Sequence, residues 1–294
     1  MGQLLKNRVA IITGAGRGIG RAISVAFARE GACLFLAART EAELAETANA
    51  CREVGAKAQV VVTDVSNRNQ VQRLIDTAIQ EAGHVDILVN SAGIYGPIGP
   101  TADIDISLWI RAAEVNFFGP FYLSRTLIPH FIKRKQGKII LLGGGGATTP
   151  LPNFSSYAAT KAGVVRLADT LAEELKVHNV QVNVIAPGLI DTQLQDEVLA
   201  AGPRAGALFD KIKQARETGS GAVSPEIAAN LAVFLASEAS GRLTGKLIAA
   251  PYDPWREWAG KAEELNATPL YTIRRLDPFT IKPLIKDLGL ETGG

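Results

Sequence analysis

The feature that most constrains the fold of this chain is a repeated alternation between short apolar runs and amphipathic stretches. The apolar runs are rich in β-branched residues and have the length of strands. They lie at 9–14, 33–39, 58–64, 86–93, 137–143, 180–188 and 243–251. Several are apolar throughout, which is typical of parallel strands buried on both faces. The alternation predicts βαβ units, and therefore an α/β fold with one doubly wound parallel sheet of the Rossmann type.

Helical periodicity fills the stretches between the apolar runs. Clear examples lie at 21–31, 41–55 and 69–83, and the last two end at Gly55 and Gly83, which suit helix C-caps. In an open sheet of this kind, ligands bind beyond the carboxyl ends of the strands. The alternation stops after Pro251. We therefore predict one domain over residues 1–251 and a C-terminal extension over 252–294 that packs on the domain or on a partner subunit.

Composition excludes several classes of function. With 294 residues, 47% of them hydrophobic, the chain can bury one large core. Its net charge is +2 and no basic block stands out, so we expect no nucleic-acid partner. No apolar run is long enough to span a bilayer and no secretory leader is visible, so we expect no membrane partner. Cys33 and Cys51 belong to no metal-like cluster, which favours a cytoplasmic protein with reduced thiols and no metal site.

A glycine-rich turn, TGAGRGIG at 13–20, lies between the first predicted strand and the first predicted helix. Such a turn lets a diphosphate approach backbone amides at a helix N-terminus, because Gly14, Gly16, Gly18 and Gly20 carry no side chain. The spacing is not the standard G-x-G-x-x-G. The alternative interpretation is a tight connection between strand and helix that binds nothing.

The end of the second predicted strand indicates which cofactor would bind. An NAD site usually has an acidic residue there for the ribose 2′-hydroxyl, whereas this chain has Arg39 and Thr40. Arg39, together with Arg17, is suited to pair with a 2′-phosphate. We therefore favour NADP(H) over NAD(H). In the alternative interpretation Arg39 is solvated and Glu41 supplies the acid.

Further motifs follow the glycine turn in a fixed order: VTDVS with Asp64, NSAG at 90–93, AEVNFFG with Asn116, YAATK with Tyr157 and Lys161, and APGLIDT with Pro187, Gly188 and Thr192. Together with TGAGRGIG they resemble the short-chain dehydrogenase/reductase family over about residues 5–250. NSAG differs from the family's NNAG at Ser91.

This resemblance implies an oxidoreductase that moves a hydride between a nicotinamide cofactor and a small carbonyl compound or secondary alcohol. It assigns the acid–base role to Tyr157, assigns ribose binding to Lys161, and gives Asn116 a water that links the lysine to solvent. Four residues along a helix place Tyr157 and Lys161 on one face, and a nearby ammonium is expected to lower the pKa of a phenol from about 10. The alternative is a packed tyrosine and a solvated lysine.

The resemblance also assigns the cofactor contacts and an assembly. The cofactor-binding residues are expected to be Gly14, Gly16, Arg17, Gly18, Ile19, Gly20, Arg39, Thr40, Asp64, Val65, Asn90, Ala92, Gly93, Tyr157, Lys161, Pro187, Gly188 and Thr192. A homodimer or homotetramer is expected, formed through the helix after Asn116 and the helix that carries Tyr157.

One catalytic position departs from the family. Thirteen residues before Tyr157, where the family has a serine that binds the substrate oxygen, the chain has Gly144 within a run of four glycines. A threonine (Thr148 or Thr149), a backbone amide of the run, or a water would then replace the hydroxyl. Alternatively the chain binds cofactor with weak or non-redox activity, serves as a binding or regulatory module without catalysis, or carries an introduced substitution.

Two segments are expected to set specificity. Residues 192–221 correspond to the mobile substrate lid of the family. The extension after residue 251 contains Trp255, Trp258, Tyr271, Arg274 and Arg275, which either roof the active site or form a packing arm.

Overall fold

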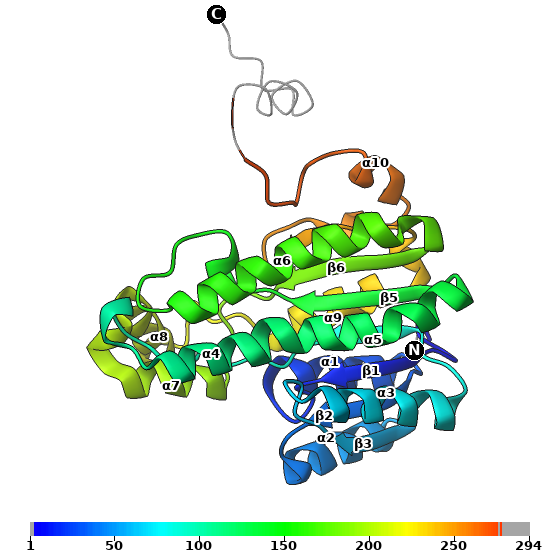
Figure 1. Ribbon diagram of the computed structural model, residues 1–294, viewed down its shortest axis with the longest axis horizontal. Helices are drawn as coiled ribbons and strands as arrows, with labels where there is room; N and C mark the ends of the chain where they lie inside the picture. The colour runs from blue at the N-terminus through cyan, green and yellow to red at the C-terminus, as the bar shows by residue number, and fades with distance from the viewer. Residues whose placement is uncertain (1–2, 276, 278–294) are drawn as a thin grey trace, which may run out of the picture.

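The computed structural model describes residues 3–275 and residue 277. It contains one seven-stranded sheet with the order β3-β2-β1-β4-β5-β6-β7, and every neighbouring pair is parallel. This confirms the predicted doubly wound sheet (Figure 1). The strands are β1 (Val9–Thr13), β2 (Cys33–Ala38), β3 (Ala58–Val62), β4 (Ile87–Asn90), β5 (Gly137–Leu142), β6 (Val180–Ala186) and β7 (Leu247–Ala249).

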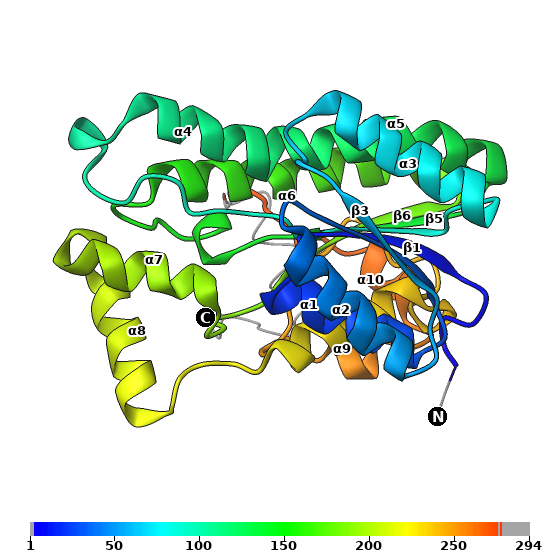
Figure 2. The same cartoon turned by 90° about the horizontal axis from the view of Figure 1, so that it is seen from below.

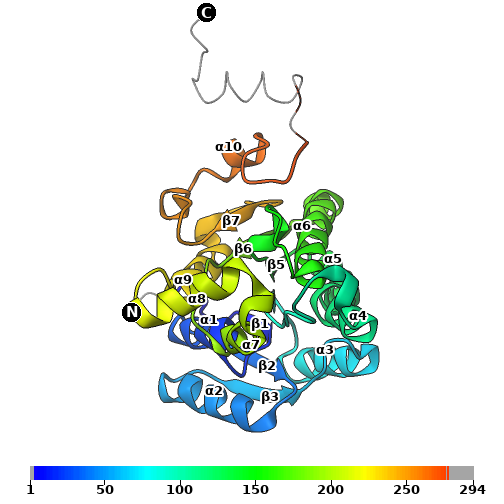
Figure 3. The same cartoon turned by 90° about the vertical axis from the view of Figure 1, so that its left-hand side faces the viewer.

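Helices cover both faces of the sheet (Figures 2 and 3). One layer consists of α1 (Gly18–Arg29), α2 (Glu41–Glu53) and α9 (Pro225–Ala236), and the other of α3 (Arg68–Ala82), α4 (Ile106–Ala113), α5 (Gly119–Arg134) and α6 (Ser155–Leu175). Each layer encloses its own apolar cluster against the sheet. Two further helices, α7 (Gln193–Ala201) and α8 (Ala207–Thr218), lie within the predicted lid segment, and α10 (Ala262–Asn266) follows the last strand.

Local sequence signals explain where α3 begins and ends. The side chain of Asn67 accepts hydrogen bonds from the backbone N–H groups of Asn69 and Gln70 and so caps the N-terminus. Gly83 ends the helix in the left-handed conformation, with a φ of 78°. The predicted C-cap at Gly83 is therefore confirmed.

The last strand is shorter than the predicted run at 243–251. Gly245 has a φ of 72°, so the chain turns before the strand and regular pairing begins only at Leu247. β7 is also the edge of the sheet, and the N–H of Leu247 donates to the carbonyl oxygen of Tyr271 at 2.7 Å. The C-terminal extension thus covers backbone groups that an edge strand would otherwise expose.

Side chains anchor this extension on the domain. Trp255 and Trp258 are buried in the cluster that contains α1 and α9, and the ring of Trp258 lies 4.6 Å from that of Tyr271. Arg274 forms an ion pair with Asp169 of α6 at 3.1 Å. These contacts pack the described part of the extension against the domain. Both tryptophans belong to a different apolar cluster from the one that contains Tyr157.

Among the described residues, none of the helices has the length and apolar character required to cross a bilayer.

Candidate active site

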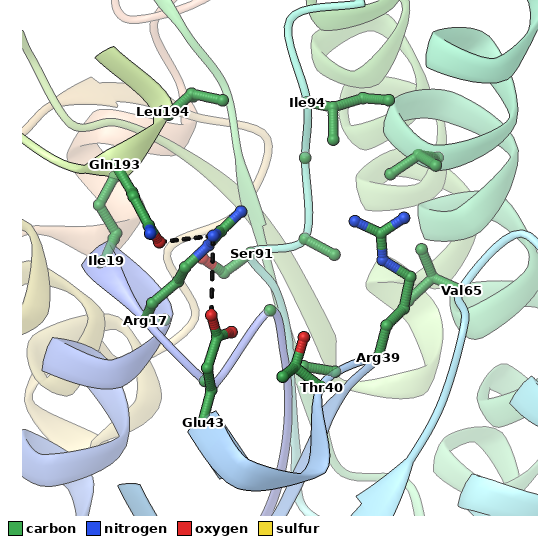
Figure 4. A pocket seen from close by; sticks show the side chains of 18 of the residues that line it. Arg17, Ile19, Arg39, Thr40, Glu43, Val65, Ser91, Ile94, Gln193 and Leu194 are labelled. Carbon is green, nitrogen blue, oxygen red and sulfur yellow. Dashed lines mark hydrogen bonds and ion pairs between the residues drawn. The ribbon is translucent and has the colours of Figure 1, made fainter. Parts of the chain in front are cut away.

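A cavity of about 290 Å³ opens at the carboxyl ends of β1, β2 and β4, on either side of the point where the strand order reverses (Figure 4). This is the position at which doubly wound sheets bind ligands. Its walls include most of the predicted cofactor residues: Gly14, Gly16, Arg17, Gly18, Ile19, Gly20, Arg39, Thr40, Asp64, Val65, Ala92, Gly93 and Thr192.

The glycine turn is shaped by close backbone contacts. Gly14 has a φ of 64°, and a Cβ there would lie 2.7 Å from the backbone nitrogen of Ala92. Gly18 also has a positive φ, of 53°, and a Cβ there would lie 3.3 Å from a methyl group of Thr192. The turn therefore depends on glycine both for its backbone conformation and for contact with its neighbours.

Two arginines face the end of the cavity formed by β2 and α2. Arg17 donates a hydrogen bond to Gln193 of the lid and lies 3.7 Å from a carboxylate oxygen of Glu43 (Figure 4). The guanidinium of Arg39 lines the same cavity and makes no hydrogen bond or ion pair with the other residues that the structure describes. This end of the cavity thus holds an accessible cation whose N–H groups are not bonded to a carboxylate of the described residues.

Two acidic residues lie at this end of α2. Glu41 is exposed and is not among the residues of the cavity wall, whereas Glu43 lines it. The helix α2 begins at Glu41, and its rotation brings the Cβ of Glu43 against Gly16, 2.9 Å from a Cβ built there. The cavity wall therefore favours Glu43 over Glu41 as the acid nearest to a bound ligand.

Asp64 lines the cavity, and its carboxylate is already held by protein groups. Its carboxylate accepts hydrogen bonds from the Ser66 hydroxyl at 2.7 Å and from Arg111 of α4 at 2.6 Å. Burial alone would raise the pKa of Asp64, but these hydrogen bonds outweigh it and lower the pKa. Asp64 therefore remains an anion that orders the loop after β3.

Five predicted cofactor residues are not among the residues that line the cavity: Asn90, Tyr157, Lys161, Pro187 and Gly188. Asn90 is buried in β4, and neither polar atom of its side chain has a hydrogen-bond partner among the described residues. Gly188 has a φ of 84° and packs against Pro251.

Asn116 lies in a π-helical turn, Glu114–Phe118, that connects α4 and α5. Its side-chain amide is fully buried and makes two hydrogen bonds to the backbone of Ile94. Oδ1 accepts from the Ile94 N–H at 2.9 Å, and Nδ2 donates to the Ile94 carbonyl oxygen at 2.8 Å. Nδ2 also lies 3.2 Å from the hydroxyl of Thr160 on α6. A π turn inserts one extra residue, and here it aims this amide at the chain that leaves β4.

Tyr157 and Lys161 lie on one face of the first turns of α6, as their spacing predicts. Lys161 is buried, its ammonium donates to the carbonyl of Leu142 at 2.7 Å, and its nitrogen lies 5.7 Å from the centre of the Tyr157 ring. A Cβ on Gly93 would lie 3.5 Å from the same nitrogen and 3.4 Å from Oδ1 of Asn116. Gly93 therefore joins the cavity wall to the catalytic candidates.

Burial dominates the titration of this pair. It lowers the pKa of Lys161 from 10.5 to about 8 and raises the pKa of Tyr157 above its ordinary value, with the neighbouring Tyr95 adding to the increase. The expected lowering of the Tyr157 pKa by the lysine is thus not found, because desolvation of the phenol outweighs any effect of a lysine that is itself buried. Tyr157 is a protonated acid at neutral pH.

The glycine run follows β5. Gly144 is buried beside the Tyr157 ring, at the start of a 3₁₀ turn, Gly145–Ala147. Thr148 and Thr149, considered as replacements for the serine hydroxyl, are both exposed.

Sequence reasoning missed a connection between α7, in the predicted lid segment, and the surroundings of Tyr157. The hydroxyl of Tyr95 bonds to Oε1 of Gln195 on α7 at 3.1 Å, and both side chains are buried. The ring of Tyr95 lies 4.8 Å from that of Tyr157. Tyr95 follows NSAG by two positions, which places it at the carboxyl end of β4. That position was a usable signal, whereas nothing local in the sequence indicates Gln195.

The side chains that pack around Tyr157 are apolar. The buried members of this cluster are Tyr95, Phe154, Val198, Ala205 and Ile212, and the partly buried side chains packed against them are Ile98, Leu151, Tyr157, Leu189, Leu194, Leu199, Ala201, Leu208 and Phe209. The ring of Tyr157 thus belongs to an apolar cluster to which α7 and α8 contribute half of the side chains.

The arrangement fits a dinucleotide. Bare glycine backbone lines the cavity where a diphosphate would approach a helix N-terminus, and Arg39 offers a cation at the far end. Asn116 and Lys161 border the other end through Gly93, and the ring of Tyr157 lies 5.7 Å from the Lys161 nitrogen.

Comparison with known proteins identifies relatives that are dehydrogenases and reductases. The model of the short chain dehydrogenase family matches residues 8–202. The chain is 37% identical over 246 residues to 3β-hydroxysteroid dehydrogenase 1 of Eggerthella lenta, covering 83% of this chain and 92% of that protein. It is 33% identical over 249 residues to cis-4-hydroxycyclohexanecarboxylate dehydrogenase of Sinomonas cyclohexanicum, with coverages of 85% and 97%. The crystal structure of a variant of actinorhodin polyketide ketoreductase with NADPH superposes with a TM-score of 0.77 at 27% identity, with coverages of 85% and 97%.

Proposed function

Since the chain belongs to the short-chain dehydrogenase family, we propose that it transfers a hydride between NADP(H) and a carbonyl compound or secondary alcohol, with Tyr157 as the acid–base group. The observation that carries the proposal is that Asn116 and Lys161 converge behind Gly93 of the cavity wall, while the ring of Tyr157, 5.7 Å from the Lys161 nitrogen, packs in an apolar cluster. Neither feature alone requires this chemistry, but their junction is where a hydride donor and a carbonyl would meet.

The nicotinamide, when bound, supplies the hydride. The protein supplies the proton, and burial keeps that proton on the Tyr157 hydroxyl at neutral pH. As the substrate oxygen gains negative charge it becomes a better acceptor, and the tyrosine donates to it. Lys161, with its nitrogen 5.7 Å from the phenol ring centre, stabilises the phenolate that remains. Asn116 fixes the backbone at Ile94, which holds the cavity wall at this junction in place.

The preference for NADP(H) is supported by the charges at the β2 end of the cavity. Arg17 already contacts Glu43 and Gln193, whereas the guanidinium of Arg39 is available to a 2′-phosphate. Guanidinium groups bind phosphate through charge-assisted hydrogen bonds. The NADPH in the related ketoreductase structure is consistent with this preference.

The substrate class is proposed from the apolar side chains around Tyr157. They are leucines, isoleucines, valine, alanines and aromatic residues, and the buried hydroxyl among them, that of Tyr95, is paired with Gln195. Apolar surroundings of the acid–base group favour an apolar substrate with one carbonyl group. Two relatives are named for cyclic alcohols, a steroid and a hydroxycyclohexane carboxylate. We therefore place cyclic and alicyclic ketones first among the candidate substrates.

An oligomer is part of the proposal. Three apolar side chains of α4, Ile106, Leu108 and Ile110, are more than half exposed, and Phe118 and Phe121 follow in the next turns. Clusters of this kind mark association surfaces. The α6 surface, also expected to contribute, is partly covered near Arg166 and Asp169 by residues 273–274 of the extension. We therefore favour a homodimer through α4 and α5 over a tetramer.

The direct test is the oxidation of NADPH at 340 nm against a panel of cyclic ketones. Tyr157→Phe is expected to lower kcat by about 10²- to 10⁴-fold, because it removes the proton donor, and to leave the NADPH dissociation constant within about twofold. Tyr252→Phe, at a side chain that is 79% exposed, is the matched control and is expected to retain full activity. Tight NADPH binding without turnover of any ketone would instead favour a member of the family with weak or non-redox activity.

A further inference from the structure

Position 144 requires glycine because a side chain would have no space there, and not because of its backbone conformation. Its φ of 177° and ψ of 165° describe extended backbone that any residue adopts. A Cβ at this position, however, would lie 2.5 Å from Oη of Tyr157. It would also lie 3.0 Å from Cζ and 3.1 Å from Cε1 of the ring. The phenol hydroxyl thus occupies the volume that any side chain at 144 would need.

The neighbouring glycine shows that this is a property of one position. A Cβ on Gly145 would have no atom within 4 Å, and the φ of Gly145 is not positive. The two residues belong to the same turn but differ in their relation to Tyr157. The pair therefore offers a position where a side chain collides with the acid and a position where it does not.

The tyrosine has little freedom to retreat from position 144. Its ring packs against the ring of Tyr95, with centroids 4.8 Å apart, and Tyr95 is itself fixed by Phe154 at 5.2 Å and by its hydrogen bond to Gln195. A new atom at 144 would therefore push the phenol as a rigid unit. Displacement of a reacting group by about 1 Å can reduce turnover by about 100-fold.

We infer that Gly144 is a positioning residue: it makes room for the hydroxyl of Tyr157, so the site is built around the missing serine and cannot accept one. The inference rests on the proposed function and deepens it. It reverses the expected effect of a serine at this position. If the site merely lacks the hydrogen-bond donor that a serine would supply, Gly144→Ser raises turnover and Gly144→Ala does not. If Gly144 instead leaves space for the Tyr157 hydroxyl, both substitutions impair the enzyme alike, because both add the same Cβ.

The kinetic experiment compares Gly144→Ala, Gly144→Ser and the control Gly145→Ser, with NADPH and the best ketone from the panel. We expect both substitutions at 144 to lower kcat by about 100-fold and to shift the pH profile of kcat, with the NADPH dissociation constant within about twofold. Gly145→Ser keeps its backbone N–H and is expected to retain kcat within about threefold. A serine variant as active as the parent chain, or more active, overturns the inference.

A stability cycle tests the same contact without any turnover. Gly144→Ala is made both in the parent chain and in Tyr157→Phe, which lacks the hydroxyl oxygen nearest to the added Cβ. We expect the alanine to lower the melting temperature by about 5 °C or more in the parent chain and by clearly less in the phenylalanine background. Equal losses in the two backgrounds overturn the inference.

The two experiments separate the possible failures. If no ketone is reduced but the stability cycle shows coupling, the proposed function fails and the contact stands. If ketones are reduced and the cycle shows no coupling, the positioning role fails alone. If Gly144→Ala does not fold in the parent chain, recovery of folding in the Tyr157→Phe background supports the contact, and failure in both backgrounds contradicts it.

Discussion

At the scale of single residues, Arg39 is the side chain that we expect to discriminate between NADP(H) and NAD(H). Its guanidinium lines the cavity without a hydrogen-bond or ion-pair partner among the described residues, whereas Arg17 contacts Glu43 and Gln193. Loss of charge-assisted hydrogen bonds costs about 1.5–3 kcal/mol. We predict that Arg39→Ala weakens NADPH binding by about 10- to 100-fold and leaves NADH binding unchanged, as measured by fluorescence titration.

NADH serves as the reference ligand in this titration, because it lacks the 2′-phosphate that Arg39 is expected to bind. Arg73→Ala, on the exposed surface of α3, controls for a general loss of positive charge. Equal weakening of both cofactors by Arg39→Ala would mean that the arginine supports the fold of the cavity and does not recognise the phosphate.

The proposed role of Lys161 implies that activity depends on pH near 8. Burial lowers its pKa from 10.5 to about 8, so the ammonium proposed to stabilise the Tyr157 phenolate is lost as the pH rises through about 8. We predict that kcat/KM for ketone reduction falls above pH 8 with the loss of one proton, measured in buffers of constant ionic strength. A flat profile to pH 9.5 would contradict this role.

The same pKa shift has an effect of known sign on stability. Between about pH 8 and pH 10.5 the unfolded chain keeps a proton on Lys161 that the folded chain has lost, so the free energy of unfolding rises with pH in this window. Below pH 8 the folded state carries the full cost of the buried charge. Lys161→Met removes this contribution, so its denaturant midpoint is expected to rise less steeply from pH 8 to pH 10.

At the scale of elements, the sequence predicted the order of strands and helices because each βαβ unit carries its own periodicity. The glycine turn and the Tyr157–Lys161 pair were predictable for the same reason, since their partners are local in the chain. Boundaries were less accurate: β7 is three residues long because Gly245 turns the chain just before it.

Features that depend on distant partners could not be predicted. Tyr95 and Gln195 are 100 residues apart, and their hydrogen bond forms only because the lid helix α7 lies over the end of β4. The choice of Glu43 over Glu41 depends on the rotation of α2, which sequence periodicity fixes too loosely. The π turn at Asn116 has no local signal, because its extra residue is identified by hydrogen bonds alone.

The extension is an element whose attachment can be tested directly. Lys246 is 3% exposed and donates hydrogen bonds to the carbonyl oxygens of Thr268 and Leu270, at 2.8 and 3.0 Å. Lys246→Met leaves these two oxygens without that donor, at a cost of about 1–3 kcal/mol. We predict a lower melting temperature and faster proteolysis around residues 268–275.

Lys261→Met is the control for this prediction, because Lys261 is an exposed residue of the same extension. If both variants melt at the temperature of the parent chain, the hydrogen bonds from Lys246 do not hold the extension in place.

At the scale of the whole molecule, the α4–α5 face is the surface expected to bind a second copy. Leu108 is 54% exposed there. A charge at the centre of an apolar interface is strongly unfavourable unless it is paired. We predict that Leu108→Asp converts the dimer into a monomer in sedimentation velocity runs, whereas Val177→Asp, at an exposed site after α6, leaves the dimer intact. A parent chain that sediments as a monomer would remove this part of the proposal.

The contact between Gly144 and the phenol of Tyr157 also limits which sequences are reachable from this one by single mutations. A serine at 144 collides with the tyrosine unless a second substitution, for example at Tyr95, first gives the ring somewhere to move. The single mutant Gly144→Ser, which would carry the serine together with Tyr157 and Lys161, is therefore expected to be less active than the parent chain with glycine. A change at Tyr95 would therefore have to precede the serine for the site to accept it.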